Sequence, residues 1–373
     1  MAEQEKKELA MSRKTTAAVL TEAGGRYSLE SVELDDLRRG EVYVRVEACG
    51  LCHTDVTMQH VMPMPAVIGH EGAGVVEEIG PGVDYVKPGD RVIISWPACG
   101  VCPNCVAGMR YVCDEQFALL FRGCRPDGSK TIKWKGEWIT GSFFQQSSLA
   151  KHAIVRAEAL VKVEEDVPPE ILASLPCGVM TGAGSVLNAM EVGAQDDLVV
   201  FGVGGVGLSG VMAGHLTGAD PIIAVDINVD RLALALELGA THAVNAEKED
   251  VVARVMEIVP LGMRQALDAS GAADAWKAAG QILRYGGTFG SAGVPMGETL
   301  SGHPPDMFSK GIRVQFIMAG FAVPRIFLPR LIKWYQQGRF PIDRMVKTFP
   351  FAQVNEAFEE QHKGDVVKPV LLM

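Results

Sequence analysis

The feature that most constrains the fold is a glycine-rich segment in the middle of the chain, Gly202-Val203-Gly204-Gly205-Val206-Gly207. It follows the short apolar run Leu198–Phe201, which favours a strand, and precedes an apolar stretch that favours a buried helix. Among 41 glycines, a chance match to the spacing G-x-G-x-x-G is easy. The strand before the segment and the helix after it make the match specific, because this order opens a βαβ unit.

The residues beyond this segment continue the alternation. Pro221–Val225, Gln265–Ala269 and Gly287–Ser291 are strand candidates, and Arg231–Leu238 is an amphipathic helix that ends at Gly239. Strands that alternate with helices indicate an α/β fold with a doubly wound parallel sheet.

One uncharged stretch, Leu198–Ala219, covers 22 residues and is long enough to cross a bilayer. Seven of these residues are glycines, and the stretch begins with a short strand candidate. A strand, a glycine turn and a buried helix explain it better, so no membrane association is expected.

The glycine segment is also a candidate dinucleotide site. The second strand ends at Asp226, 24 residues after the first glycine, where a carboxylate would bind ribose hydroxyls and repel a 2′-phosphate. This favours NAD over NADP. The alternatives are a glycine-rich packing turn with Asp226 as a helix cap, and a solvated surface role for Arg231, which could otherwise reach the ribose. The glycines whose backbone would approach the pyrophosphate are Gly202, Gly204, Gly205 and Gly207.

The first half of the chain is predicted to be mainly β-structure. Val42, Val44 and Val46 alternate with polar residues, and Gly72–Val76 and Arg91–Ile94 are further strand candidates between Pro-Gly turns. Short strands with regular turns indicate a barrel-like β domain. Two end segments complete the pattern: Met1–Lys14 is expected to be a frayed or helical extension, and a helix at Leu328–Gln337 and a strand at Pro369–Leu372 are expected near the C-terminus.

Composition narrows the class of protein. A chain of 373 residues with 48% hydrophobic residues predicts two globular domains and excludes a disordered chain. The net charge of −10, with no basic run, argues against nucleic acid as a partner. The charged N-terminus lacks the apolar core of a signal peptide, so the cytoplasm is the expected location. Eight clustered cysteines in such a chain favour metal binding over disulfides.

Four of these cysteines lie within fifteen residues, in the order Cys99-x2-Cys102-x2-Cys105-x7-Cys113. Four thiolates are the ligands of a closed, tetrahedral, structural zinc site. An iron–sulfur cluster is the rival, but ferredoxin-type runs have other spacings and usually a proline after the last cysteine, where this chain has Asp114. Disulfides are the other alternative.

A second metal site is indicated by residue type alone. Cys52, His70 and Cys177 would supply two thiolates and one imidazole, the ligand set of a catalytic zinc with an open fourth position. No local spacing shows that the three converge. A packed histidine at His70 and a small buried hydrophobe at Cys177 are the alternatives.

At these residues the sequence resembles the zinc-dependent medium-chain alcohol dehydrogenases, over nearly the whole chain beyond Thr15. The shared motifs are Gly50-Leu51-Cys52-His53-Thr54-Asp55, Gly69-His70-Glu71-Gly72-Ala73-Gly74, the four-cysteine loop, Cys177 and the glycine segment. Within the family it is most similar to the aryl-alcohol (benzyl alcohol) branch. The stretches that point to this branch are Arg125–Ser129, Phe143–Ser148, Thr181–Gly184 and Gly338–Asp343.

The resemblance implies a GroES-like β-barrel catalytic domain over residues 1–178, completed by 321–373, and an NAD-binding Rossmann domain over 179–320. Cys52, His70 and Cys177 would hold a catalytic zinc and the four-cysteine loop a structural one, giving two zinc ions per subunit. Because members of this family usually assemble from identical subunits, the resemblance also implies a homodimer or homotetramer.

The resemblance also assigns roles around the catalytic zinc. Asp55 would orient His70, Glu71 would lie close to the metal, and Thr54 would pass on the alcohol proton. His53 and Lys368 would neutralise the pyrophosphate; a plain surface lysine is the less favoured alternative for Lys368.

The implied activity is reversible, NAD-dependent oxidation of primary aryl or allylic alcohols to aldehydes. A general short-chain alcohol dehydrogenase, a glutathione-adduct dehydrogenase and a non-catalytic, zinc-braced NAD(H) sensor are the alternatives. The preferred direction and the physiological substrate are left open.

Two departures from the family pattern stand out. Thr57 occupies the place where many members have a proton-relay histidine, so relay beyond Thr54 needs the cofactor ribose and water, or His60. The loop between Cys52 and His70 is about three residues shorter than usual. Its methionines Met58, Met62 and Met64 could wall a substrate pocket or simply be core.

Overall fold

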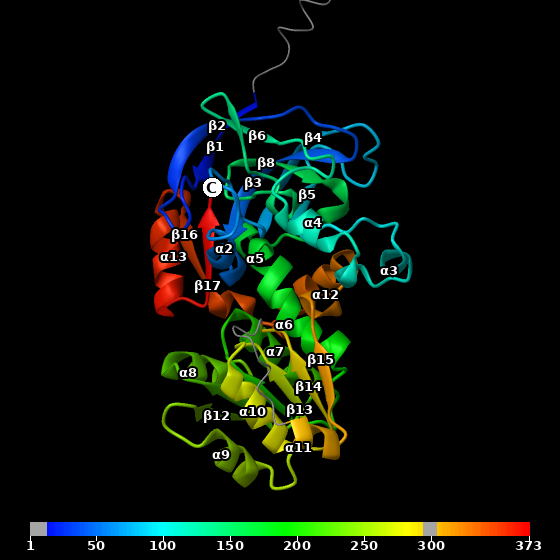
Figure 1. The fold of residues 1–373 in the computed structure, drawn as a ribbon, viewed down its shortest axis with the longest axis vertical. Coiled ribbons are helices and arrows are strands. Elements are labelled where there is room, and N and C mark those ends of the chain that lie inside the picture. Colours follow the sequence, from blue (N-terminus) through cyan, green and yellow to red (C-terminus); the bar gives the residue numbers. More distant parts are fainter. Residues whose placement is uncertain (1–12, 294–303) are drawn as a thin grey trace, which may run out of the picture.

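The computed structural model describes residues 13–293 and 304–373. They form two lobes, one built of β-sheets and one built around a parallel sheet (Figure 1). The expected N-terminal extension lies mostly outside the described residues. Arg13 and Lys14, expected to be frayed or helical, instead begin a strand that pairs with residues 28–34, so that part of the expectation was wrong.

The β lobe contains two mainly antiparallel sheets. Seven strands form the larger one in the order β16-β17-β3-β4-β5-β9, with β8 also paired to β3: Val346–Pro350, Lys368–Leu372, Glu41–Gly50, Gly72–Ile79, Arg91–Ile94, Leu160–Val163 and, for β8, His152–Arg156. Four strands form the smaller one, β1-β2-β6-β7: Arg13–Val19, Ser28–Leu34, Ile132–Trp134 and Glu137–Ile139. The strand Lys368–Leu372 therefore joins the sheet of the first half, where it pairs with β3.

The second lobe contains six strands, all paired in parallel, in the order β12-β11-β10-β13-β14-β15. Their bounds are His242–Asn245, Ile222–Asp226, Leu198–Phe201, Met263–Asp268, Leu283–Ser291 and Arg313–Phe316. The helices between them are α7 (Gly205–Thr217), α8 (Val229–Glu237), α9 (Val251–Ile258), α10 (Ala273–Ile282) and α11 (Pro304–Ser309). The predicted doubly wound parallel sheet is confirmed. The uncharged stretch is β10, a turn and the buried helix α7.

One continuous helix connects the lobes. It runs over Pro169–Ala189 through α5 (Pro169–Ser174), η4 (Leu175–Val179), α6 (Met180–Gly184) and η5 (Ser185–Ala189). By length and composition it could cross a bilayer, but 72% of its apolar window is buried inside the protein. We call it the central helix. The expected domain boundary at 178 lies inside it, so both lobes share this element.

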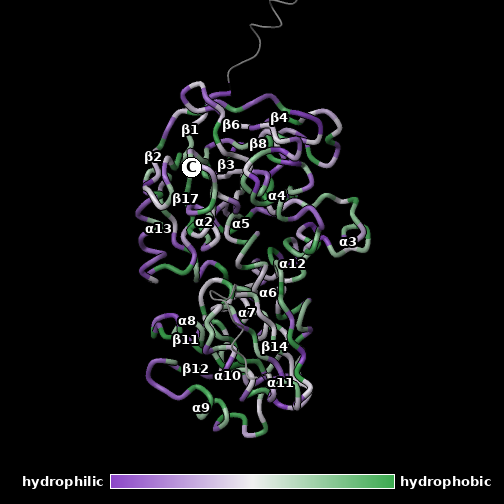
Figure 2. Tube along the Cα trace, in the orientation of Figure 1, coloured by the Kyte–Doolittle hydropathy of each residue, from purple (hydrophilic) through white to green (hydrophobic). Residues whose placement is uncertain are grey.

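The remaining helices lie mainly on the β lobe. They are α2 (His53–Met58), α3 (Pro103–Val106), α4 (Gln116–Phe121), α12 (Pro324–Gln336) and α13 (Val354–Lys363), with short turns of 3-10 helix at η1 (Arg110–Val112), η2 (Phe143–Gln145), η3 (Ala157–Ala159), η6 (Ala319–Phe321), η7 (Ile342–Met345) and η8 (Phe351–Gln353). Hydrophilic residues are frequent along outer helices such as α13 (Figure 2).

The largest hydrophobic core is continuous between the lobes. It extends from Leu51 and Phe143 in the β lobe, through Leu175 and Val186 of the central helix, to Leu208 beneath the parallel sheet. Burial of this central helix therefore sets how the two lobes meet, and every candidate site residue described below lies near that junction or on an edge of the parallel sheet.

Candidate active site

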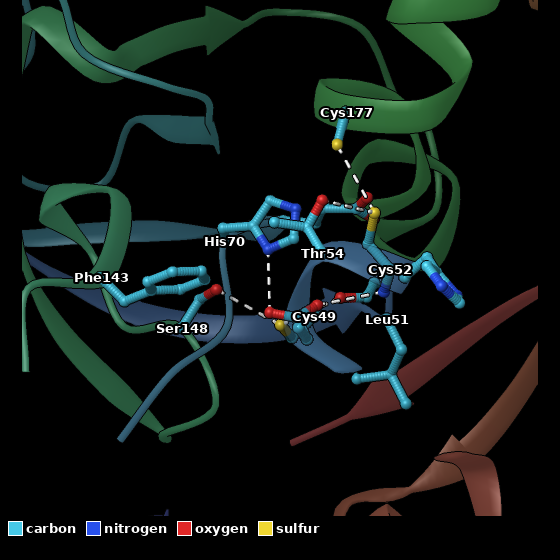
Figure 3. A network of polar contacts seen from close by, with 12 residues as sticks. Cys49, Leu51, Cys52, Thr54, His70, Phe143, Ser148 and Cys177 are labelled. Atoms are coloured by element: carbon cyan, nitrogen blue, oxygen red, sulfur yellow. Dashed lines mark hydrogen bonds and ion pairs between the residues drawn. The ribbon is translucent and has the colours of Figure 1, made fainter. Parts of the chain in front are cut away.

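Three of the predicted ligands converge although they are far apart in the sequence. Cys52 lies immediately before α2, His70 two residues before β4, and Cys177 in the central helix (Figure 3). The Sγ atoms of Cys52 and Cys177 are 3.6 Å apart. One donor atom from each of these three side chains and from Glu71 lies within 4.8 Å of the others.

Asp55 orients two of these side chains. Its Oδ2 accepts a hydrogen bond from the Cys52 backbone amide at 3.0 Å, and its Oδ1 lies 2.9 Å from His70 Nδ1. With Nδ1 held in this way, Nε2 of His70 is buried and has no hydrogen-bond partner. Burial alone would lower the pKa of His70, but the Asp55 carboxylate raises it well above its usual value.

Cys177 is presented by an irregular turn of the central helix. The segment Leu175–Val179 is a π-helix, and its Pro176 has no backbone N–H to donate. Single π-turns within α-helices occur frequently at functional sites. The wider turn places the Cys177 thiol beside Cys52.

The two thiols affect each other's ionisation. The neighbouring Cys177 thiol lowers the pKa of Cys52 well below its usual value, with His70 acting in the same direction. The same contact, together with burial, raises the pKa of Cys177. Without a cation the pair therefore favours one thiolate and one thiol, and a metal would be needed to hold both as thiolates.

Glu71 and Lys368 form a buried ion pair beside the thiols. Glu71 is fully buried and Lys368 is 4% exposed. The Lys368 ammonium contacts the Glu71 carboxylate and the carbonyl oxygen of Leu51. Burial raises the pKa of Glu71 to about 7, against the opposing effect of Lys368. The other carboxylate oxygen of Glu71, Oε1, is buried without a partner.

Aromatic side chains cover the imidazole. The rings of Phe144 and His70 have centroids 4.5 Å apart, and Phe143 meets His70 edge-on at 5.6 Å. Phe121 packs on Phe144 at 5.5 Å. In the sequence, Phe143 and Phe144 belong to a stretch shared with the aryl-alcohol branch, and their place in the site was not predicted. An aromatic pair next to a polar run was the only available signal.

The segment that carries these rings is held in an unusual backbone conformation. Ser142, Phe144, Gln145 and Ser147 all have positive φ, between 52° and 54°, which is uncommon for residues other than glycine. Gln146 Nε2 donates to the carbonyl oxygens of His70 at 2.9 Å and of Ser95 at 3.1 Å. Such conformations persist only where the surroundings enforce them.

These donors fit a zinc ion. At a Zn–S distance of about 2.3 Å, two tetrahedral thiolate ligands are roughly 3.8 Å apart, close to the 3.6 Å between Cys52 and Cys177. The unpartnered Nε2 of His70 supplies a third donor. Two sulfurs and one ring nitrogen leave a fourth position for substrate.

The four-cysteine loop forms a second cluster, whose donor atoms also lie within 4.8 Å of one another. Cys99 and Cys105 have Sγ atoms 3.9 Å apart, near the tetrahedral value of about 3.8 Å. Backbone amides of Cys99 and Cys102 point at the sulfurs of Cys113 and Cys99, at 3.3 and 3.4 Å. All four cysteines are free of disulfides, and the cluster fits a closed zinc site.

The glycine segment forms a cradle at the carboxyl edge of the parallel sheet. A Cβ at Gly207 would lie 1.8 Å from the carbonyl oxygen of Gly202, so only glycine allows this turn. Among residues 13–293 and 304–373, a Cβ at Gly204 would meet nothing within 4 Å, and a Cβ at Gly205 would meet only the carbonyl oxygen of Val367 at 4.0 Å. The cradle thus has room for a phosphate group where α7 begins.

Asp226 is tied to this cradle. Its Oδ2 accepts from the Val203 amide at 2.7 Å, and its Oδ1 accepts from the amides of Ile227 and Asn228 at 2.8 and 2.9 Å. Arg231 lies one turn into α8, where Nη2 is 3.5 Å from the carbonyl oxygen of Gly364 and Nε is buried without a partner.

The other predicted residues fall in different places. Thr54 Oγ1 lies 3.7 Å from Cys52 Sγ, whereas His53 is exposed at the start of α2. Lys368 is neither a surface lysine nor free to face the cradle, because Glu71 occupies its ammonium group. A pyrophosphate contact would have to share that pair.

The short loop before His70 lies against the β lobe. Met62 is in the core, and Met58 and Met64 pack against it. This favours the interpretation that these methionines are core residues. His60 is exposed and its ring lies against Gly24. Cys49, which has no assigned role, points to Ser148 Oγ at 3.3 Å and forms no pair with Cys52.

Comparison with known proteins agrees with this geometry. Residues 38–165 match the family model of the alcohol dehydrogenase GroES-like domain, and residues 205–336 match that of the zinc-binding dehydrogenases. The chain therefore belongs to the zinc-dependent medium-chain alcohol dehydrogenase family, and the expected α/β fold with a GroES-like and a Rossmann-like part is confirmed. It is an enzyme that oxidises or forms alcohols with a nicotinamide cofactor.

Three relatives define its neighbourhood. Geraniol dehydrogenase of Castellaniella defragrans is 38% identical over 361 residues, covering 95% of this chain and 97% of the relative. The crystal structure of benzyl alcohol dehydrogenase from Acinetobacter calcoaceticus is 37% identical with a TM-score of 0.93, covering 96% and 99% of the two chains. S-(hydroxymethyl)glutathione dehydrogenase of Paracoccus denitrificans is 33% identical over 374 residues, covering 96% and 100%.

Proposed function

We propose that the protein catalyses reversible, NAD-dependent oxidation of primary aryl and allylic alcohols to aldehydes. The observation that carries the proposal is the buried, unpartnered Nε2 of His70, which lies with the thiols of Cys52 and Cys177 beneath an aromatic wall. We assign these three residues to a catalytic zinc and the four-cysteine loop to a structural zinc, two ions per subunit.

The chain's own residues divide the work. Zinc at this site would act as a Lewis acid that lowers the pKa of the alcohol, and the nicotinamide would accept hydride from its α-carbon. Asp55 holds the imidazole so that Nε2 faces the thiols. Thr54, whose hydroxyl lies beside Cys52, would take up the alcohol proton, and the ribose of a bound cofactor and water would be its next acceptors. The exposed position of His60 against Gly24 gives no support to a relay through that residue.

The substrate class is supported by the rings above His70. Phe121 is partly exposed and packs on Phe144, which is 8% exposed and in turn packs on His70, while Phe143 is fully buried behind them. An aromatic or conjugated chain would pack against the exposed part of these rings better than ethanol. The names of two relatives, geraniol dehydrogenase and benzyl alcohol dehydrogenase, refer to an allylic and an aryl alcohol. Conjugation also stabilises the carbonyl that develops as hydride leaves.

We propose NAD as the cofactor because of the charge of Asp226. Its carboxylate lies at the end of β11 beside the glycine cradle, where it would repel the 2′-phosphate of NADP. The glycine backbone would hold the pyrophosphate, with Arg231 near the ribose and His53 contributing positive charge. Lys368 would contribute charge only by sharing its ammonium group with Glu71.

One alternative has a specific observation behind it. The similarity to S-(hydroxymethyl)glutathione dehydrogenase keeps a glutathione adduct among the candidate substrates. A purified enzyme should be given NAD with benzyl alcohol, geraniol, ethanol or S-(hydroxymethyl)glutathione at mildly alkaline pH, while the absorbance of the reduced cofactor is followed. The proposal predicts the highest kcat/KM for the first two. A higher kcat/KM for ethanol or the glutathione adduct would contradict the proposed substrate class. No turnover of any alcohol or aldehyde would favour a non-catalytic NAD(H) sensor.

We also propose a homodimer or homotetramer that works in the cytoplasm. Strand β15 is an edge of the parallel sheet, and Val314 and Phe316 on it are 42% and 55% exposed. Nearby in sequence, Phe308 is 89% exposed. An exposed, apolar edge strand is a surface that natural proteins usually cover.

A further inference from the structure

One aromatic contact joins the four-cysteine loop to a distant part of the chain. Tyr111 lies in η1, two residues before Cys113, and its ring stacks on Phe321 of η6 with centroids 4.4 Å apart and an angle of 11°. Both side chains are partly buried against the main core. The proposed zinc loop thus has a direct contact outside itself, although it supplies no group to the alcohol.

The segment that Tyr111 touches is strained. Ala319, Gly320 and Phe321 have φ values of 50°, 64° and 50°, and two of the three are not glycine. They follow β15, at the carboxyl edge of the parallel sheet, where nucleotides bind in folds of this kind. A backbone in this region needs contacts on more than one side to keep it there.

The second contact comes from the central helix. A Cβ at Gly184 would lie 2.4 Å from the carbonyl oxygen of Gly320, so the two backbones touch. Asn188 Nδ2 donates to the same carbonyl oxygen at 3.2 Å. Cys177 stands in this same helix, on the side of the β lobe. Segment 319–321 is therefore held between Tyr111 and the helix that presents a proposed zinc ligand.

We propose that Tyr111 is a positioning residue for the alcohol-oxidising site. Contact with its ring holds segment 319–321 against Gly184. This contact fixes the position of the central helix at which Cys177 lies beside Cys52. The four-cysteine loop then has a role beyond its own stability, because it holds Tyr111 in place. The inference rests on the proposed function for its catalytic consequence, but not for its structural one.

Hydrogen exchange tests the structural consequence in the full-length protein. The amides of Phe321 and Ala322 donate to the carbonyls of Met318 and Ala319 at 3.0 and 3.2 Å. Tyr111→Ala should speed exchange in a peptide that covers 318–322 and in one that covers 177–188. Tyr111→Phe keeps the ring and should exchange like the wild type. Trp138→Ala removes a partly exposed aromatic side chain that packs on Lys133 in the smaller sheet, and is the control for general loosening.

Kinetics and spectroscopy test the catalytic consequence. Tyr111→Ala should lower kcat for benzyl alcohol about tenfold, because a small displacement of a reacting group has large effects on rate. With cobalt in place of zinc, the thiolate-to-metal absorption bands of the Tyr111→Ala variant should shift relative to those of the wild type. Tyr111→Phe and Trp138→Ala should keep the wild-type spectrum and the wild-type kcat. Should Tyr111→Ala fail to fold, Tyr111→Leu retains apolar volume without a flat ring and serves the same comparison.

The outcomes separate this inference from the proposed function. Unchanged exchange in both peptides, or an unchanged kcat and cobalt spectrum in the alanine and leucine variants, would overturn the positioning role. Equal defects in Tyr111→Phe would overturn the part played by the ring. If the wild type oxidises no alcohol, the proposed function fails, and the exchange measurement still decides whether Tyr111 holds segment 319–321.

Discussion

Asp55 shows how much of the site depends on one side chain. Its two carboxylate oxygens serve different partners, the Cys52 amide and the His70 ring. It is fully buried in the first turn of α2, where its charge also lies near the positive end of the helix. A neutral amide at this position could accept from one partner well, but it could not supply the negative charge that orients the imidazole.

Asp55→Asn should therefore weaken zinc binding at the catalytic site by about 10- to 100-fold, the usual effect of losing a carboxylate behind a histidine ligand. The measurement is zinc retained against a graded chelator, with turnover followed in parallel. Asp90→Asn is the matched control, because Asp90 likewise accepts from the amide three residues earlier, Lys87, at 2.9 Å. Equal zinc retention in Asp55→Asn and the wild type would remove Asp55 from the site.

Asp226 carries the second prediction at this scale. Asp226→Gly removes the charge and three backbone hydrogen bonds at the cradle, so NAD should bind more weakly and the ratio of kcat/KM for NADP to that for NAD should rise. Asp230→Gly, at an exposed acid in the first turn of α8, controls for charge alone. An unchanged cofactor ratio in Asp226→Gly would contradict the assignment.

Residue type allowed part of the site to be predicted, and burial decided the rest. Cysteine and histidine in these motifs pointed to Cys52, His70 and Cys177 because few other side chains bind zinc. Lys368 was expected at the pyrophosphate, but its strand lies inside the larger sheet between β16 and β3, which turns the ammonium toward Glu71. The place of Phe144 depends on a positive φ, which no residue pattern predicts.

The central helix is the element that relates the lobes. Gly182 and Gly184 lie on it where no Cβ fits, because a Cβ would be 1.9 Å from the carbonyl oxygen of Val206 and 2.4 Å from that of Gly320. The Thr181–Gly184 stretch, first noted as a mark of resemblance, thus has a packing explanation. One glycine lets the helix touch the start of α7, and the other lets it touch η6.

Gly184→Ala should destabilise the protein, although alanine is favoured over glycine in helices by about 1 kcal/mol. Overpacking against backbone costs about 1–3 kcal/mol, so we expect a net loss of stability, measured as a lower Tm. Gly193→Ala is the control, since its Cβ would meet only Asp196 Oδ2 at 3.9 Å. A Tm equal to or above that of the wild type in Gly184→Ala would show that the contact is loose.

The elements themselves were largely predictable. Alternation and glycine turns predicted strands over Val42–Val46, Gly72–Val76 and Leu198–Phe201. The observed strands are Glu41–Gly50, Gly72–Ile79 and Leu198–Phe201, so the first two are longer than predicted. The alternation of Val42, Val44 and Val46 with polar residues is typical of a strand with one buried face, but Tyr43 is buried as well, against residues of the smaller sheet. Pro176 is a local signal for an irregular turn at Cys177, because it has no backbone N–H to donate, but it does not predict that the turn is π-helical.

The molecule as a whole presents an open edge. If strand β15 mediates assembly, Phe316→Lys should convert the oligomer to a species of about one chain, 40.0 kDa, without loss of fold. Light scattering after gel filtration measures the mass. Leu261→Lys, at a loop residue that is 83% exposed, is the control for added charge. A wild-type protein that is already monomeric, or an unchanged mass in Phe316→Lys, would contradict the proposed interface.

Two clusters of potential metal ligands lie in different parts of the sequence, and we expect them to have different tasks. Cys52 belongs to the cluster with an open position, whereas Cys102 belongs to the closed loop beside α3. Loss of the first ligand should abolish chemistry with little effect on folding. Loss of the second should chiefly lower stability, because metal binding there would hold a loop whose residues Val101 and Val106 are 81% and 76% exposed.

The most direct test is zinc content measured together with turnover of benzyl alcohol in the wild type, Cys52→Ala and Cys102→Ala. We predict two zinc ions per subunit in the wild type, and in Cys52→Ala one zinc ion, a near-normal Tm and no turnover. Cys102→Ala should have a lower Tm than the wild type, and it should lose activity only as it unfolds. A Cys52→Ala variant that keeps both zinc ions, or that still oxidises the alcohol, would contradict the account.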